Sequence, residues 1–266
     1  MNSLLSNDKE KINQIKPRDK FENIKSKCIL KKLCNNLEKK KLFNIIKYNK
    51  NIKNRININI NDYKEFSELY SSIEIEIMLV NNKYGRFINI EDIEEKYYHI
   101  YFNNNKEEIK RKYINKNEKI KLIKIIIDYQ IKSFNYLFYN CYCVESIYFK
   151  QFCRNNINNM RGMFYYCSSL KELNLDNFNT NNVTDMGSMF YECSSLKELN
   201  LDNFNTNNVT DMDEMFSYCS SLIELNLYNF NTNNVINMKY MFSECSEDLK
   251  MIIKNKYNQL RKEAFI

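Results

Sequence analysis

Cysteine recurs at a fixed interval in this chain. Four of the nine cysteines stand 26 residues apart. Three others, Cys141, Cys143 and Cys153, form a C-x-C pair with a distant third cysteine and no nearby histidine, which is a weak pattern for a zinc site. We therefore interpret the recurring cysteines as a buried column of small apolar side chains. They are Cys167, Cys193, Cys219 and Cys245.

Other components of a catalytic site are scarce. The chain has one histidine, His99, and three glycines, Gly85, Gly162 and Gly187. A multi-histidine metal site and a glycine-rich phosphate loop therefore cannot be assembled. The carboxylates recur on a repeated polar surface, which is a poor environment for raising a carboxyl pKa. We expect a non-enzymatic protein with no catalytic residue, cofactor or metal.

The cysteine interval belongs to a longer repeat. Residues 167–186 read CSSLKELNLDNFNTNNVTDM, and residues 193–212 read the same twenty letters. A third copy, CSSLIELNLYNFNTNNVINM, occupies residues 219–238. A degenerate earlier copy is visible at residues 137–141. Repetition of this kind indicates units that stack and share one continuous core.

Each copy contains two hydrophobic patterns. The alternating leucines of residues 170–175 predict a short strand. The three-and-four spacing of apolar residues in 183–193 predicts a short helix, with polar side chains at 180–184 capping its start. The predicted fold class is thus an α/β repeat, a leucine-rich-repeat-type solenoid with one strand and one short helix per 26-residue coil over residues 122–246.

The repeat resembles the BspA-like leucine-rich repeats of bacterial lipoproteins and protist surface proteins. The motif that carries the resemblance is MFxxCSSLKELNLxNFNTNNVTDM, and the resemblance covers residues 122–246. It implies a leucine-rich solenoid used in adhesion and interaction, without catalysis. We accordingly expect a protein–protein interaction scaffold that binds through the strand face.

The outward positions of the predicted strands define a candidate binding face. Between Met163 and Ser246 there are three Lys and eleven Asp or Glu, a net charge of −8, whereas the whole chain carries +7. An acidic face would attract a basic protein partner, although copy-number expansion alone would also leave such columns. The candidate residues are Glu172, Asn174, Asp176, Glu198, Asn200, Asp202, Glu224, Asn226 and Tyr228.

The flanking segments have different patterns. Residues 71–121 predict a small mixed α/β element, with strands at 73–77 and 98–102 and a more helical stretch at 107–113, and residues 121–127 predict a further strand. Residues 247–266 predict a C-terminal helix that caps the last repeat.

The first seventy residues contain a polar segment, 1–20, which we expect to be disordered. Residues 21–70 show the spacing of short amphipathic helices and loosely resemble an F-box, which docks on a Skp1-type adaptor of a ubiquitin ligase. A structural helical cap is the alternative. Nucleic-acid binding is not favoured, because no nucleic-acid fold signature accompanies the lysines. The candidate adaptor-docking residues are Ile29, Leu30, Leu33, Leu37, Leu42 and Ile45.

The sequence contains no targeting pattern. No apolar run approaches the roughly 20 residues that a membrane-spanning helix needs, and no signal peptide follows Met1. We expect an intracellular, cytoplasmic protein with reduced thiols. A surface or adhesion protein is the further alternative, in which the acceptor sequences at Asn182 and Asn208 would be glycosylated.

Overall fold

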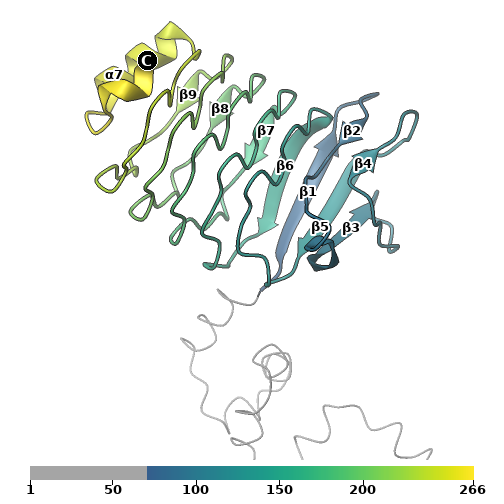
Figure 1. The fold of residues 1–266 in the computed structure, drawn as a ribbon. Helices are drawn as coiled ribbons and strands as arrows, with labels where there is room; N and C mark the ends of the chain where they lie inside the picture. The colour runs from purple at the N-terminus through teal and green to yellow at the C-terminus, as the bar shows by residue number, and fades with distance from the viewer. Residues whose placement is uncertain (1–70) are drawn as a thin grey trace, which may run out of the picture. The chain divides into compact units, whose positions relative to one another are not determined.

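The computed structural model describes residues 71–266, which lie within one compact unit spanning Glu68–Ile266. A sheet lies at one end of the described residues and a helix at the other, with the repeats side by side between them (Figure 1). The elements are β1 (Ile73–Leu79), β2 (Gly85–Arg86), η1 (Glu95–Tyr97), β3 (Tyr98–Phe102), β4 (Tyr113–Ile114), β5 (Leu122–Ile127), β6 (Val144–Gln151), β7 (Glu172–Asn174), β8 (Glu198–Leu199), β9 (Glu224–Leu225), α7 (Glu247–Lys256) and η2 (Lys262–Phe265).

The predictions for the first seventy residues fall outside the described residues. They comprise the disordered segment 1–20, the helical segment 21–70 and the F-box-like docking residues between Ile29 and Ile45. All of these stay predictions.

The sheet has five strands in the order β3-β5-β1-β6-β7. β1 pairs antiparallel with β5 and β6, while β6 pairs parallel with β7. Along β1 the isoleucines face the core, and Glu74 and Glu76 face outward, where they form ion pairs with Lys124 at 2.9 Å and Lys150 at 3.2 Å. This two-residue period confirms the strand predicted from the alternating sequence.

The strands predicted at 98–102 and 121–127 are also confirmed, as β3 and β5. The more helical stretch expected at 107–113 is wrong. The Ile109 N–H donates to the carbonyl of Ile100 on β3, and Tyr113 begins the short strand β4. Pairing with existing strands therefore replaces the local hydrogen bonds that a helix would need.

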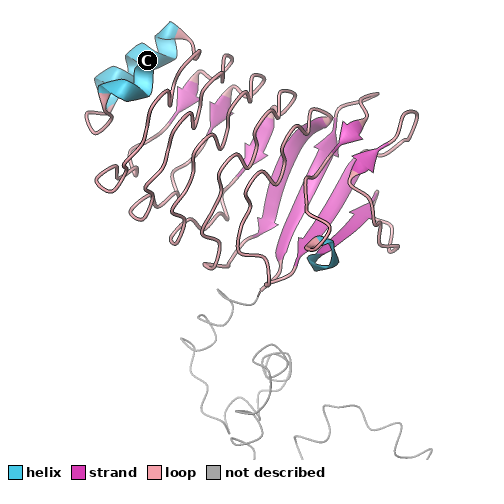
Figure 2. Ribbon diagram, in the orientation of Figure 1, coloured by secondary structure: helices cyan, strands magenta, loops and turns pink. Residues whose placement is uncertain are grey.

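Mixed sheets and few helices make up the described residues (Figure 2). From residue 133 to α7 the chain forms a repeat-type arrangement, in which backbone groups pair with equivalent groups one repeat further along. Each repeat contains a run of consecutive turns, here called the turn segment. A row of single parallel bridges joins the residues at the start of successive turn segments. The bridged residues are Ser133, Asn159, Asp185, Asp211 and Asn237.

The short helix predicted for each repeat is wrong: residues 122–246 contain turns and short strands but no helix. The Gly162 N–H donates to Gly187 O at 2.8 Å, and the Phe164 N–H donates to Met189 O at 2.9 Å, both in the next repeat. The alternate N–H groups, at 163 and 165, donate to carbonyls three residues earlier. An α-helix requires bonds to the residue four positions earlier, so a backbone that gives every second N–H to its neighbour cannot form one.

The turn segments bend through left-handed backbone conformations at two places in each repeat, where φ lies between 52° and 60°. Only one of these ten residues is a glycine. A Cβ on Gly162 would lie 2.2 Å from a ring carbon of Tyr136, so glycine is needed there because of the neighbouring ring. The ten residues are Tyr136, Asn140, Gly162, Tyr166, Ser188, Glu192, Glu214, Tyr218, Tyr240 and Glu244.

The polar residues expected to cap helices join the repeats together instead. Thr180 is buried, and its Oγ1 donates to Asn205 O at 3.0 Å and accepts from Asn205 N at 2.7 Å. Thr206 repeats both contacts with Asn231. Side-chain oxygens therefore satisfy backbone groups of the next repeat in a part of the chain that lacks regular secondary structure.

The core contains parallel columns of identical side chains. Phenylalanine rings stack face to face from repeat to repeat, with centroids 5.3–5.6 Å apart. The rings belong to Phe138, Phe164, Phe190, Phe216, Phe242 and Phe265.

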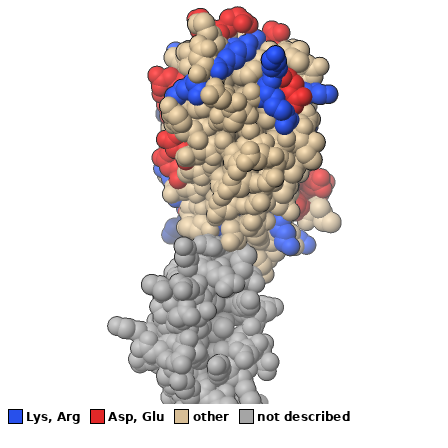
Figure 3. Space-filling model, turned by 90° about the vertical axis from the view of Figure 1, so that its left-hand side faces the viewer, with Lys and Arg blue, Asp and Glu red and all other residues tan. Residues whose placement is uncertain are grey.

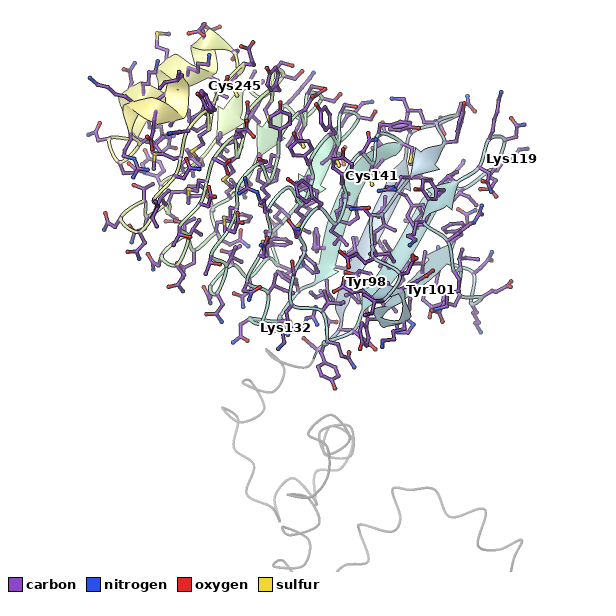
Figure 4. All side chains as sticks on the ribbon, in the orientation of Figure 1. Tyr98, Tyr101, Lys119, Lys132, Cys141 and Cys245 are labelled. Atoms are coloured by element: carbon purple, nitrogen blue, oxygen red, sulfur yellow. The ribbon has the colours of Figure 1, made fainter. Side chains whose placement is uncertain are left out.

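The cysteine column lies within this core, between Cys141 and Cys245 (Figure 4). The Cys167 thiol donates to Phe138 O at 3.1 Å, and the next three cysteines repeat this contact. Burial raises the pKa of each thiol, which keeps it protonated and able to donate. The predicted buried column is confirmed.

The closing helix expected at residues 247–266 is present as α7, but it ends at Lys256. The Ser246 hydroxyl accepts from the Leu249 N–H at 3.2 Å and caps its first turn, and Leu249 and Ile253 are buried. After α7 the chain returns along the last repeat, where Tyr240 N donates to Glu263 O and the Phe265 ring ends the stack. The terminal segment thus supplies backbone partners that the last repeat would otherwise lack.

Candidate binding surface

Strands β7, β8 and β9 place the three glutamates of the candidate face in one exposed column. Glu172 starts β7, Glu198 starts β8 and Glu224 starts β9. Glu198 and Glu224 are direct register partners in the parallel pair β8–β9. Paired parallel strands lie about 4.8 Å apart, so these two carboxylates repel each other across the ladder.

The glutamates differ in their partners. The Tyr148 hydroxyl on β6 donates to Glu172, and this hydrogen bond is the main reason that the Tyr148 pKa is raised. The side-chain carboxylates of Glu198 and Glu224 have no hydrogen-bond or ion-pair partner among residues 71–266. Unpaired negative charge is thus concentrated on β8 and β9.

The asparagines of the face close the turn that follows each strand. Asn200 Oδ1 accepts from the Asp202 N–H at 3.0 Å, and Asn226 Oδ1 accepts from the Tyr228 N–H at 3.1 Å. Asn226 Nδ2 also donates to Asp202 Oδ1 at 2.6 Å, which joins neighbouring repeats. Asn174 makes the same local contact with Asp176. The asparagines therefore hold the backbone, while Asp202 and Tyr228 stay exposed.

A groove lies between this face and α7. Its volume is about 560 Å³, within the range of roughly 300–1,000 Å³ typical of ligand sites. Glu198, Asn200, Asp202, Glu224 and Asn226 of the predicted face line it. The structure thus brings five of the nine predicted face residues to one groove. Glu172, Asn174, Asp176 and Tyr228 are not among the lining residues.

The sequence did not predict the groove wall formed by α7, nor one residue of the wall formed by the strands. Ile252 and Lys256 of α7 line the groove, and so does Ile223, which precedes β9. Ile223 and Ile252 are 59% and 50% exposed, so large apolar surfaces face the groove. A signal for Ile223 was present in the sequence, because the two earlier copies have Lys at the same position.

Charge is unevenly distributed at the α7 end of the molecule (Figure 3). Charged side chains of both signs gather over α7 at the top of this view, and the surface below them is mostly uncharged. Lys256 Nζ lies 4.7 Å from the centre of the Tyr228 ring and 5.4 Å from that of Tyr257. On the helix wall of the groove, Lys256 therefore faces the acidic strand wall.

The residues considered for chemistry occupy structural positions. His99 Nδ1 lies 3.0 Å from Glu108 Oε1, and His99 Nε2 lies 3.7 Å from Asp128 Oδ2, on the half-buried outer side of β3. Cys141 and Cys143 are buried, and Cys153 is exposed. Within residues 71–266, no three His, Cys, Asp or Glu side chains form a group able to hold a metal ion.

The two glycosylation acceptor sequences lie on exposed loops. Asn182 Nδ2 donates to Asn155 O and Asn208 Nδ2 donates to Asn181 O, both at 2.7 Å. Each side-chain amide thus joins adjacent repeats. No helix within the described part of the chain is long and apolar enough to cross a membrane.

Comparison with known proteins identifies the repeats and little else. Residues 132–255 match the family described as "Mycoplasma protein of unknown function, DUF285". No curated protein and no solved structure matches the chain. The chain therefore carries a repeat-type family domain over residues 132–255, the part that contains the candidate binding surface.

Proposed function

We propose that this chain is a non-enzymatic binding protein and that its repeats form a BspA-like leucine-rich-repeat solenoid. The leucines of each copy support this assignment: Leu170 and Leu175 are buried, and Leu173 between them packs against the core. The strands between these leucines form a second row of equivalent residues beside the turn segments. A surface made of identical positions suits recognition of an extended partner.

The partner is a protein with a basic surface, bound at the strand face. The observation that carries this proposal is the unpartnered pair Glu198 and Glu224, exposed in register on β8 and β9. Two adjacent like charges destabilise the sheet slightly. A Lys or Arg from a partner would relieve that repulsion, and the acidic repeats would speed its approach at low salt.

Neutralising the two glutamates should release the partner. In Glu198→Gln/Glu224→Gln, the recovery of basic partners with the full-length chain should fall about tenfold, as expected for the loss of two interfacial ion pairs. Quantitative mass spectrometry after affinity purification from cells that express the chain measures this. Raising the salt concentration should release the same proteins from the wild type.

The matched control is Glu107→Gln/Glu244→Gln, which removes two exposed carboxylates away from the strand face. It should leave recovery unchanged. Equal recovery with both variants would show that the strand face does not bind the partner.

A further inference from the structure

The third repeat copy departs from the first two in a consistent way. Ile223, Tyr228 and Ile236 are 59%, 67% and 81% exposed. All three replace polar residues of the earlier copies, so stacking of the repeat does not require an apolar residue at these positions. The equivalent residues are Lys171 and Lys197 for Ile223, Asp176 and Asp202 for Tyr228, and Thr184 and Thr210 for Ile236.

Of the three substituted residues, Ile223 lines the groove beside α7, and the Tyr228 ring lies next to the lining residue Lys256. Ile252 of α7 lines the groove as well. Tyr228 is two residues after the lining residue Asn226, and its ring packs edge-on against Tyr257 at 5.4 Å and remains mostly exposed. Apolar side chains from the last repeat and from α7 are therefore left in water around one concave site, as at ligand-binding grooves.

The rim of the groove is acidic on the strand side. Glu198, Glu224 and Asp202 line it, and its one lining cation within the described residues is Lys256. The Lys256 ammonium lies over the Tyr228 and Tyr257 rings, an arrangement that favours a cation through the ring quadrupole. The groove thus combines an apolar patch with a net negative rim.

We propose that this groove binds a polypeptide segment carrying a large apolar side chain flanked by Lys or Arg. The apolar side chain would cover Ile223 and Ile252, and the flanking cations would lie against Glu198 and Glu224. This proposal rests on the proposed function of the strand face and adds the apolar anchor and its place. Charge complementarity selects basic over acidic segments, and burial of the anchor selects apolar over polar ones.

Fluorescein-labelled peptides test the proposal by anisotropy with the full-length chain. A peptide with the core KKLFKK should bind at least tenfold more tightly than KKSSKK, because two apolar side chains leave water. A peptide with the core EELFEE should not bind. Equal binding of KKLFKK and KKSSKK, or no binding of KKLFKK to the wild type, would overturn the proposal.

Variants that restore the residues of the earlier copies locate the site. Ile223→Lys/Tyr228→Asp keeps the net charge and uses residues that two preceding repeats already accommodate. It should bind KKLFKK about tenfold more weakly and KKSSKK unchanged. Ile236→Thr restores the third substituted position, which lies outside the groove, and should bind as the wild type does.

The outcomes separate the two proposals. Full binding of KKLFKK by Ile223→Lys/Tyr228→Asp would overturn the groove proposal and leave the strand-face function intact. Full binding of both basic peptides by Glu198→Gln/Glu224→Gln would overturn the strand-face function itself.

Discussion

Phe190→Ala should lower the free energy of unfolding of the repeats by about 3–5 kcal/mol, the usual cost of deleting a buried phenylalanine ring. Phe190 is fully buried and stacks at 5.5 Å on both Phe164 and Phe216. The cavity would lie in the middle of the column, where rings on both sides are held by their own repeats and cannot close it. Urea unfolding followed by circular dichroism gives the difference.

The control is Phe265→Ala at the end of the same column. That ring is only partly buried and stacks on a single ring, Phe242, at 5.3 Å. We expect a loss of about 1–2 kcal/mol, because less surface leaves the core and the terminal segment can relax. Equal losses for the two substitutions would contradict a column whose stability comes from neighbours on both sides.

Arg161→Ala should also destabilise the fold strongly, by about 2–3 kcal/mol at neutral pH. Arg161 Nη1 lies 3.3 Å from Asp185 Oδ1 and 3.1 Å from Asp211 Oδ2. Arg161 Nη2 lies 2.9 Å from Asp213 Oδ1. The guanidinium thereby links three repeats. A Cβ on Gly187 would lie 2.2 Å from Asp213 and 2.3 Å from Arg161. Glycine at this position therefore leaves the space that the Arg161 side chain occupies.

The cost of Arg161→Ala should depend on pH. Burial and the neighbouring Asp211 carboxyl raise the pKa of Asp213 from 3.8 to about 6, because one guanidinium cannot neutralise three carboxylates. A raised carboxyl pKa in the folded state contributes stability at pH values below 3.8, and this contribution is lost as the pH rises through 6. Without Arg161 the pKa rises further, so the variant should lose more stability than the wild type between pH 4 and 7.

Unfolding of both proteins across this pH range measures the difference. Lys239→Ala serves as the control, since it removes a cation from the equivalent position two repeats after Gly187 and should change stability by less than about 0.5 kcal/mol. A loss for Arg161→Ala that is the same at pH 4 and pH 7 would contradict the carboxylate cluster.

The sequence could predict the features that depend only on the repeat period or on a local pattern of apolar residues. The period of 26 places equivalent residues side by side, so Cys167 and its successors had to form a column once the repeats stacked. Strict alternation at Ile73, Ile75 and Ile77 specified a strand with one buried face. Neither inference requires knowledge of distant contacts.

The prediction of a helix in each repeat was wrong because the spacing of apolar residues was ambiguous. Apolar residues spaced by three and four suit a helix, but they equally suit successive turns in which each residue pairs with one three positions back. The decisive bonds, such as that from Phe164 N to Met189 O, join different repeats. Left-handed backbone at Tyr166 and Glu192, where no glycine marks it, gave no local warning.

The groove was beyond prediction for a different reason. Its strand wall was named from outward positions such as Glu198 and Glu224, but its other wall depends on where α7 lies over the last repeat. That position follows from the burial of Leu249 and Ile253 in the core, and the helical pattern alone does not specify it.

The most direct test of the strand-face account is photo-crosslinking in cells from single benzoylphenylalanine residues. Asn200 is exposed on the strand face, and Tyr218 is exposed on a turn segment, so the two positions report on different surfaces. If the partner binds at the strand face, we expect crosslinks to a polypeptide partner from position 200 and none from position 218. Crosslinks from 218 alone, or to the same partner from both positions equally, would contradict binding at the strand face.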